Sequence, residues 1–206
     1  MVYLFDDDLR AGLTARLKGF AREGLDDGGL KRAAVAITVI PHEEGAGFLL
    51  TRRAPRLNAH GGQWALPGGR IDMGESPVEA ALRELREEVA LDLDASHVLG
   101  MLDDYPTRSG YLITPVVVWA AATETMVPNP GEVASLHPFA LGELEREDSP
   151  VFLTIPESDR PVIRILLGDS HVHAPTAAVL YQFREVGLAG RATRVAELEQ
   201  PVWAWR

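Results

Sequence analysis

The stretch Gly68–Leu91, GGRIDMGESPVEAALRELREEVAL, carries the clearest local signals in the chain. Ser76 is followed by Pro77 and, three residues after Ser76, by Glu79. This is the pattern of a capping box with proline at the first helical position. Apolar residues then recur at helical spacing, at Val78, Leu82, Leu85 and Val89. The sequence therefore predicts a helix from Ser76 to Val89, preceded by a glycine-rich loop.

Three carboxylates lie close together on this predicted helix. Because each residue turns by about 100°, Glu84, Glu87 and Glu88 share an arc of about 100°. Like charges placed in this way repel one another. The arc is either a solvated charged face or a site for a hard divalent cation, since Mg²⁺ and Mn²⁺ prefer oxygen ligands. Arg83 can hold the Glu87 carboxylate four residues on, and the neighbouring loop with Glu75 favours the cation site.

The spacing of these residues resembles the signature of the Nudix hydrolase family. The matching positions are Gly69, Glu75, Arg83-Glu84, Leu85, Glu87-Glu88 and Leu91. Ala90 stands where the signature has glycine, which suggests a different helix exit, since glycine permits a left-handed turn. The resemblance implies an α+β fold, the Nudix-type α/β/α sandwich with a mixed β-sheet. It also implies a pyrophosphohydrolase that uses Mg²⁺ or Mn²⁺ to cleave a nucleoside diphosphate linked to another group.

The same resemblance implies roles for individual residues. The implied metal ligands are Glu84, Glu87, Glu88 and the backbone carbonyl of Gly68. Arg83 would orient a ligand glutamate, and Glu75 would brace the loop. Water made more acidic by the metal would attack a pyrophosphate phosphorus, and Glu84 or Glu87 would accept its proton. The choice between these two bases stays open.

A second set of residues resembles the extra motif of the coenzyme A pyrophosphatase branch. It comprises Leu49–Thr51, Arg53, Ala54, Gly62 and Pro67–Gly69, with further likeness at 109–111, 113–115 and 129–133. Leu66 replaces a phenylalanine and Asn58 an arginine, and a lost guanidinium can mean a lost phosphate contact. The resemblance implies cleavage of coenzyme A or acyl-CoA to 3′,5′-ADP and (acyl-)4′-phosphopantetheine. ADP-ribose, NADH or a nucleoside triphosphate remain alternative substrates, and a non-catalytic nucleotide-binding module remains an alternative function.

Substrate contacts are expected near this motif. Arg53 is the favoured residue, with Arg52 and Gly69 as further candidates. Arg52 and Arg53 alternate along a strand, so at most one points into a given cleft. Glu132 is either an extra catalytic carboxylate or a solvated loop residue. His60 either touches substrate or lies on a surface loop.

Two pairs of residues near the C-terminus allow weaker predictions. His171 and His173 share one face of an extended segment, but no third metal ligand is evident. Trp203 and Trp205 would share one face of a strand. They are expected to pack, either on the core of this chain or on a partner subunit.

The remaining pattern predicts one domain over residues 1–206. Its core spans about 31–190, with an N-terminal helix at about 6–23 and a C-terminal extension at about 191–206. Strands are predicted at 33–40, 48–53, 64–66, 98–102, 112–122, 135–139, 151–155 and 162–166. Further helices are predicted at 141–147 and at 176–186, the latter ended by Gly187.

Composition restricts the partners. The chain has 20 Lys and Arg against 30 Asp and Glu, a formal net charge of −10, which disfavours nucleic acid but allows a small-molecule nucleotide bound through divalent cations. With no cysteine, thiolate metal sites and thiol nucleophiles are excluded. No apolar run is long enough to span a membrane, and no basic signal-peptide region precedes the first helix. We expect a cytoplasmic protein, with a homodimer as the commonest oligomeric state.

Overall fold

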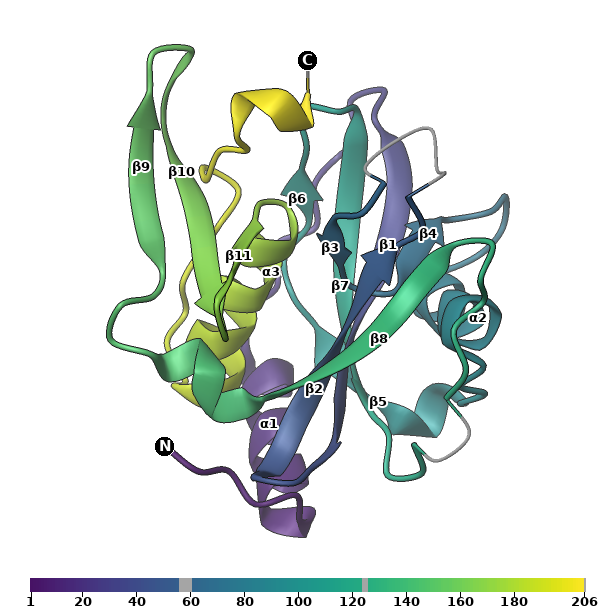
Figure 1. The fold of residues 1–206 in the computed structure, drawn as a ribbon. Coiled ribbons are helices and arrows are strands. Elements are labelled where there is room, and N and C mark those ends of the chain that lie inside the picture. The colour runs from purple at the N-terminus through teal and green to yellow at the C-terminus, as the bar shows by residue number, and fades with distance from the viewer. Residues whose placement is uncertain (56–60, 124–125, 206) are drawn as a thin grey trace.

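A mixed β-sheet forms the centre of the computed structural model, which describes residues 1–55, 61–123 and 126–205 (Figure 1). Strand β1 (Lys31–His42) runs parallel to β7 (Tyr111–Trp119) and antiparallel to β2 (Gly45–Arg53) and β4 (Gly68–Arg70). The remaining strands of this sheet are β3 (Trp64–Ala65), β5 (Val98–Met101), β6 (Tyr105–Pro106) and β8 (Val133–Ala140). The predicted α+β class with a mixed sheet is confirmed.

Both faces of the sheet are apolar and covered. On one face, Ala34, Ala36 and Ile40 of β1 pack against the helix α2 (Pro77–Val89). On the other face, Ile37 and Val39 join the larger of two hydrophobic clusters. Because β1 is buried on both sides, its sequence reads as a continuous apolar run instead of an alternating one.

The second face is covered by two helices, α1 (Asp7–Gly19) and α3 (Thr176–Phe183). Helix α1 begins at the N-cap Asp6 but ends four residues before the predicted boundary at 23. The following segment leaves the helix because Arg22 and the Glu23 N–H bond instead to the loop after β5. Helix α3 also ends early and continues as a π-helical turn, η3 (Arg184–Leu188). The prediction that Gly187 ends the helix was therefore wrong, because this glycine lies inside the turn.

A separate antiparallel sheet packs on the same side and was not foreseen as a second layer. It consists of β9 (Val151–Ile155), β10 (Ser158–Leu167) and β11 (Ser170–His173). Short 3₁₀ segments, η1 (Ala95–His97), η2 (Leu141–Glu145) and η4 (Val202–Ala204), complete the fold. The strand predicted at Trp203 and Trp205 was wrong, because the chain there forms η4 and the turn after it.

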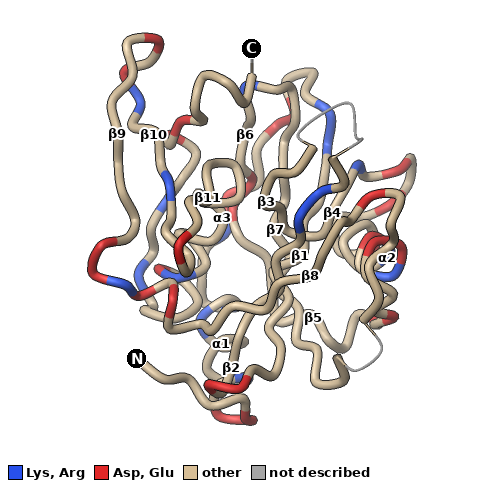
Figure 2. Tube along the Cα trace, in the orientation of Figure 1, with Lys and Arg blue, Asp and Glu red and all other residues tan. Residues whose placement is uncertain are grey.

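Charged residues are distributed unevenly over this framework. Figure 2 shows acidic residues concentrated on α2 and basic residues at the end of β2. In the described segments, no helix combines the length and apolarity that crossing a membrane requires.

Candidate metal and phosphate site

The loop before α2 and the helix itself place the site. Ser76 caps the helix by accepting a hydrogen bond from the Glu79 N–H, and the Glu79 carboxylate accepts one from the Ser76 N–H. The predicted capping box is confirmed. Gly69 of β4 lies directly against the Glu84 side chain, where any Cβ would overlap the carboxylate. Glycine at this position therefore lets the helix carboxylates approach the backbone of the central sheet.

Three carboxylates converge at this point. Glu84, Glu88 and Glu132 each offer an oxygen atom, and these atoms lie within 4.8 Å of one another. Glu84 and Glu88 come from α2, and Glu132 comes from the loop that leads into β8. A group of carboxylate oxygens at this separation suits a hard divalent cation such as Mg²⁺ or Mn²⁺. The donor set therefore fits the cation that the Nudix resemblance implies.

The electrostatics of this cluster favour a bound cation. Glu88 is only 5% exposed, and burial together with the Glu84 charge raises the pKa of Glu88 to about 8. The Gly68 N–H, at 3.3 Å, and Arg53 offset part of this effect. Burial also raises the pKa of Glu84, although Arg83 opposes the shift. Neighbouring carboxylates that resist ionisation become more stable as anions when a cation lies between them.

Arg83 connects the helix to the loop. Its guanidinium donates to Glu75 at 2.9 Å, to Glu84 at 2.8 Å and to Glu87 at 3.1 Å. A further bond reaches the carbonyl of Arg70. Glu75 also accepts from the Asp72 N–H, and its bond to Arg83 is the main reason that its pKa lies below the usual range. One guanidinium thus fixes Glu84 and the loop entrance at the same time.

The predicted ligands do not all meet. Glu87 is 48% exposed and pairs with Arg83, and it is not part of the converging group, whereas Glu132 is. Gly68 contacts Glu88 through its N–H, so a ligand role for its carbonyl stays a prediction. The sequence left Glu132 open because 44 positions separate it from Glu88 along the chain.

The loop that carries Glu132 bonds directly to the end of α2. The Asn129 N–H donates to the carbonyl of Glu88 at 2.8 Å, and the Val127 N–H donates to the carbonyl of Val89 at 3.0 Å. Sequence reasoning missed these contacts. The sequence signal for these contacts was the turn sequence Pro128-Asn129-Pro130-Gly131, which indicates a change of chain direction at this loop.

The two candidate arginines of β2 point to opposite faces, as the alternation predicts. Arg53 lies on the side of α2 and interacts with Glu88. Its Nε atom is buried and has no hydrogen-bond partner within the described chain. Arg52 lies on the other face, where it stacks on Trp64. Asn58 and His60 fall at 56–60, outside the described residues.

Ala90 corrects one prediction. It adopts the left-handed conformation, with φ 58° and ψ 27°, and the Leu91 N–H bonds to the carbonyl of Leu85. This is the helix ending that glycine would make. The expectation of a different helix exit was therefore wrong, because the docked loop holds alanine in a conformation it seldom adopts.

The C-terminal candidates lie apart from the carboxylate cluster. His171 and His173 lie on β11 with ring centroids 6.5 Å apart, and no group of potential metal ligands in the described chain includes them. His173 meets the edge of Trp203, which is 52% exposed. Trp205 faces the Arg108 guanidinium.

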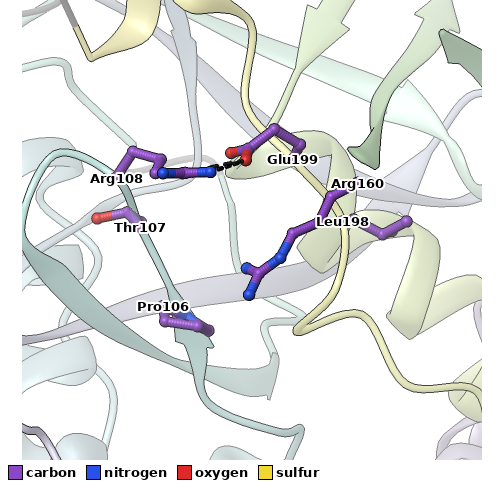
Figure 3. A pocket seen from close by; sticks show the side chains of 6 residues that line it. All are labelled: Pro106, Thr107, Arg108, Arg160, Leu198 and Glu199. Carbon is purple, nitrogen blue, oxygen red and sulfur yellow. Dashed lines mark hydrogen bonds and ion pairs between the residues drawn. The ribbon is translucent and has the colours of Figure 1, made fainter. Parts of the chain in front are cut away.

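A cavity of about 270 Å³ lies between the end of β6, β10 and the C-terminal segment (Figure 3). Arg108 points toward Glu199 across this cavity and bonds to it, and Arg160 lies beside Leu198 on the side of Glu199 (Figure 3). None of the predicted site residues lines it.

Known proteins show the same domain. A sequence model of the NUDIX domain matches residues 30–163, more than half of the chain. A curated relative from Yersinia pestis (strain Pestoides F), named "Uncharacterized Nudix hydrolase NudL", is 44% identical over 114 residues. That match covers 55% of this chain and 57% of the relative. A relative of the same name from Yersinia pseudotuberculosis (serotype O:1b, strain IP 31758) matches equally. The match therefore spans little more than half the length of these curated relatives.

Solved structures include similar chains. The Nudix hydrolase RenU from M. smegmatis is 29% identical with a TM-score of 0.44, over 60% of this chain and 75% of that one. A MutT/nudix family protein from Enterococcus faecalis is 21% identical with a TM-score of 0.48, over 73% of this chain and 57% of that one. On the match of the domain model, the chain belongs to the Nudix family.

Proposed function

We propose that this chain is a pyrophosphohydrolase that cleaves the diphosphate of a nucleoside diphosphate linked to another group, with coenzyme A or acyl-CoA as its substrate. The observation that carries the proposal is the convergence of Glu84, Glu88 and Glu132 beside the Gly68-Gly69 loop. A protein that only binds nucleotides has no need of three converging carboxylates that repel one another, one of them, Glu88, buried.

Each residue has a separable task in this reaction. Glu84, Glu88 and Glu132 would hold the divalent cation, which neutralises phosphate charge and makes a water molecule more acidic. Arg53 contacts a phosphate oxygen from the same side of the sheet. Arg83 keeps Glu84 in place through the bonds described above.

The reaction is a displacement at phosphorus by water. The water oxygen forms a new bond to phosphorus, and the bond from that phosphorus to the bridging oxygen breaks. The proton goes to a glutamate, Glu84 or Glu87, and the bridging oxygen leaves with the second phosphate. Glu84 belongs to the converging group, whereas Glu87 lies outside it and is 48% exposed; Arg83 bonds to both.

The preference for coenzyme A rests on the motif around Arg53. Leu49–Thr51, Arg53 and Gly62 match the branch motif in register, and Arg53 lies on the same face as the carboxylates. The products would be 3′,5′-ADP and 4′-phosphopantetheine or its acyl form.

Turnover on a substrate panel tests this proposal. Coenzyme A, acetyl-CoA, ADP-ribose, NADH and dGTP are each incubated with the protein and Mg²⁺ or Mn²⁺, and kcat/KM is measured. We expect the coenzyme A species to give the highest value. Hydrolysis in ¹⁸O-labelled water should place the label on one phosphate product only, because one phosphorus is attacked.

Two variants serve as controls. Glu88→Gln should abolish turnover, whereas Glu199→Gln, which removes a buried charge outside the site, should retain it. If another panel member is preferred, the substrate assignment is wrong but the chemistry stands. If none is hydrolysed, the proposal is wrong.

A further inference from the structure

Arg52 lies in an arrangement that the proposed reaction does not use. Its neighbour Arg53 faces the carboxylate cluster, and Arg52 therefore projects from the opposite face of β2. The register pairs Arg52 with Trp64 of β3 and with Ser135 of β8. Leu50, two residues earlier and on the same face, pairs with His137. Two strands thus flank Arg52 with an aromatic ring, a hydroxyl and an imidazole.

The guanidinium of Arg52 is held over the ring of Trp64. Its central carbon lies 3.9 Å from the centroid of the Trp64 ring, and Nη1 donates to the carbonyl of Gly62 at 2.7 Å. Trp64 is in turn fixed by edge contacts to His137 and Phe139, with centroids at 4.7 and 5.5 Å. The contacts with Trp64 and Gly62 hold the planar guanidinium in place, so it has little freedom to lose when a ligand binds.

Among the described residues, no carboxylate forms an ion pair with this group. The ion pairs of the described chain use Arg83, Arg108, Arg146 and other arginines, but not Arg52. The Arg52 charge also helps, after burial, to lower the pKa of His137, so this imidazole adds no second positive charge near neutral pH. A single flat cation supported by an aromatic ring suits a planar, electron-rich ring more than a second phosphate.

The position of Arg52 next to Arg53 indicates which part of the ligand would lie near it. Adjacent residues have Cα atoms about 3.8 Å apart, and β2 ends at Arg53. For the nucleoside to reach Arg52 while the diphosphate lies near Arg53, the ligand must pass round the end of β2. A purine ring is the flat group that such a nucleotide offers.

We propose that the planar guanidinium of Arg52, held over the ring of Trp64, stacks against the purine ring of the nucleotide and selects purine nucleotides as substrates. This inference rests on the proposed function, because it assumes that the diphosphate lies near Arg53.

Binding without metal and without turnover provides the test. The full chain in EDTA is titrated with AMP and with ribose 5-phosphate, which lacks the base, and Kd is measured by calorimetry. Base stacking contributes about 1–3 kcal/mol, so AMP should bind about 5- to 150-fold more tightly than ribose 5-phosphate. Equal affinity for the two probes, including no binding of either, overturns the proposal.

Variants separate stacking from charge. Arg52→Lys keeps the positive charge but loses the flat surface, so it should weaken AMP binding about 10-fold and leave ribose 5-phosphate unchanged. Trp64→Leu should have the same effect, and Trp64→Phe should restore part of it. Equal weakening of both probes by Arg52→Lys would show a phosphate contact instead and would contradict the proposal.

A matched control lies in the cavity of Figure 3. Arg160 is 46% exposed and lines the cavity of Figure 3, which could also accept a phosphate. Arg160→Lys should leave both affinities unchanged, and a selective loss of AMP binding there would place the base in that cavity and overturn the proposal. If AMP binding behaves as expected but the panel shows no hydrolysis, only the proposed function fails.

Discussion

Glu88 and Glu199 are two buried glutamates in opposite environments. Glu88 is 5% exposed and Glu199 is 2% exposed. Burial alone would raise the pKa of Glu199, but hydrogen bonds from Arg108, the Gln200 N–H and Ser158 hold it below the usual range. Glu88 accepts one bond in the described chain, from the Gly68 N–H, and its pKa rises to about 8.

The difference lies in the neighbours. A carboxylate surrounded by donors has its hydrogen bonds satisfied within the folded chain, and it holds in place the segments that supply those donors. A carboxylate surrounded by other carboxylates lacks donors for its negative charge, and a bound cation balances that charge. Burial is therefore a poor guide to function among acidic residues, whereas the number of donors to each carboxylate separates the two regions.

The largest expected effect concerns activity. Glu88→Gln removes a charge from the converging group and should lower kcat/KM by about 10²–10⁴-fold with Mg²⁺. Glu199→Gln should lower it less than about threefold, because its partners lie outside the site. Steady-state kinetics on the preferred panel substrate measures both values.

An equal loss of activity in both variants would contradict this contrast between Glu88 and Glu199. Circular dichroism and thermal melting must first show that each variant is folded. A fully active Glu88→Gln variant would remove Glu88 from the proposed metal set.

The next effect is a pH dependence of the metal-free protein. The pKa of Glu88 is about 8 in the folded chain and about 4.5 when unfolded, so the folded state binds the proton more tightly. Stability is therefore retained below about pH 4.5 and lost as pH rises toward about pH 8. Relative to Glu88→Gln, the wild type should lose about 5 kcal/mol of unfolding free energy over this interval, at about 1.4 kcal/mol for each of about 3.5 pKa units.

Urea unfolding in EDTA at several pH values measures this difference. Saturating Mg²⁺ should remove most of it, because the cation favours the ionised carboxylate. A constant difference between wild type and Glu88→Gln from about pH 5 to about pH 8 would contradict the raised pKa.

A smaller effect of opposite sign is expected at Glu199. Its folded-state pKa is lowered, so its contribution to stability is present above the unfolded pKa and is lost as pH falls through the folded value. Glu199→Gln should lower the unfolding free energy by about 1–3 kcal/mol near neutral pH, because Arg108 and Ser158 lose an ionised acceptor. Denaturation at neutral and at acidic pH would show the loss shrink as pH falls, and a loss that grows would refute it.

What the sequence could predict was local. The helix α2 followed from Ser76, Pro77 and a regular apolar spacing, because capping and periodicity act within a few residues. The pairing of Glu84 with Glu88 followed from the same helical geometry. The place of Glu132 did not, because only the tertiary fold brings the loop before β8 to the helix.

Non-local contacts explain the wrong predictions as well. Trp205 lies in a turn because its indole N–H donates to the carbonyl of Gln200, and Arg108 faces its ring. No local pattern distinguishes that turn from a strand. The separate sheet of β9, β10 and β11 was missed for the same reason, since strands were predicted at β9 and β10 but their pairing with each other and with β11 was not.

The smallest expected effect is at Ala90, which ends the helix that carries Glu88. Alanine in the left-handed conformation costs about 1–2 kcal/mol, which a glycine would avoid. Glycine also increases the conformational entropy of the unfolded chain, and this offsets part of the stabilisation. Ala90→Gly should therefore raise the unfolding free energy by about 0.5–1 kcal/mol. Because the Asn129 N–H still holds the Glu88 carbonyl, kcat and the pH dependence at Glu88 should not change. Thermal melting measures the expected rise in stability, and steady-state kinetics at several pH values tests whether kcat and its pH dependence are unchanged. A less stable variant would show that the docked loop and not the residue type governs this helix end, and an altered pH profile would show that the environment of Glu88 depends on the helix exit.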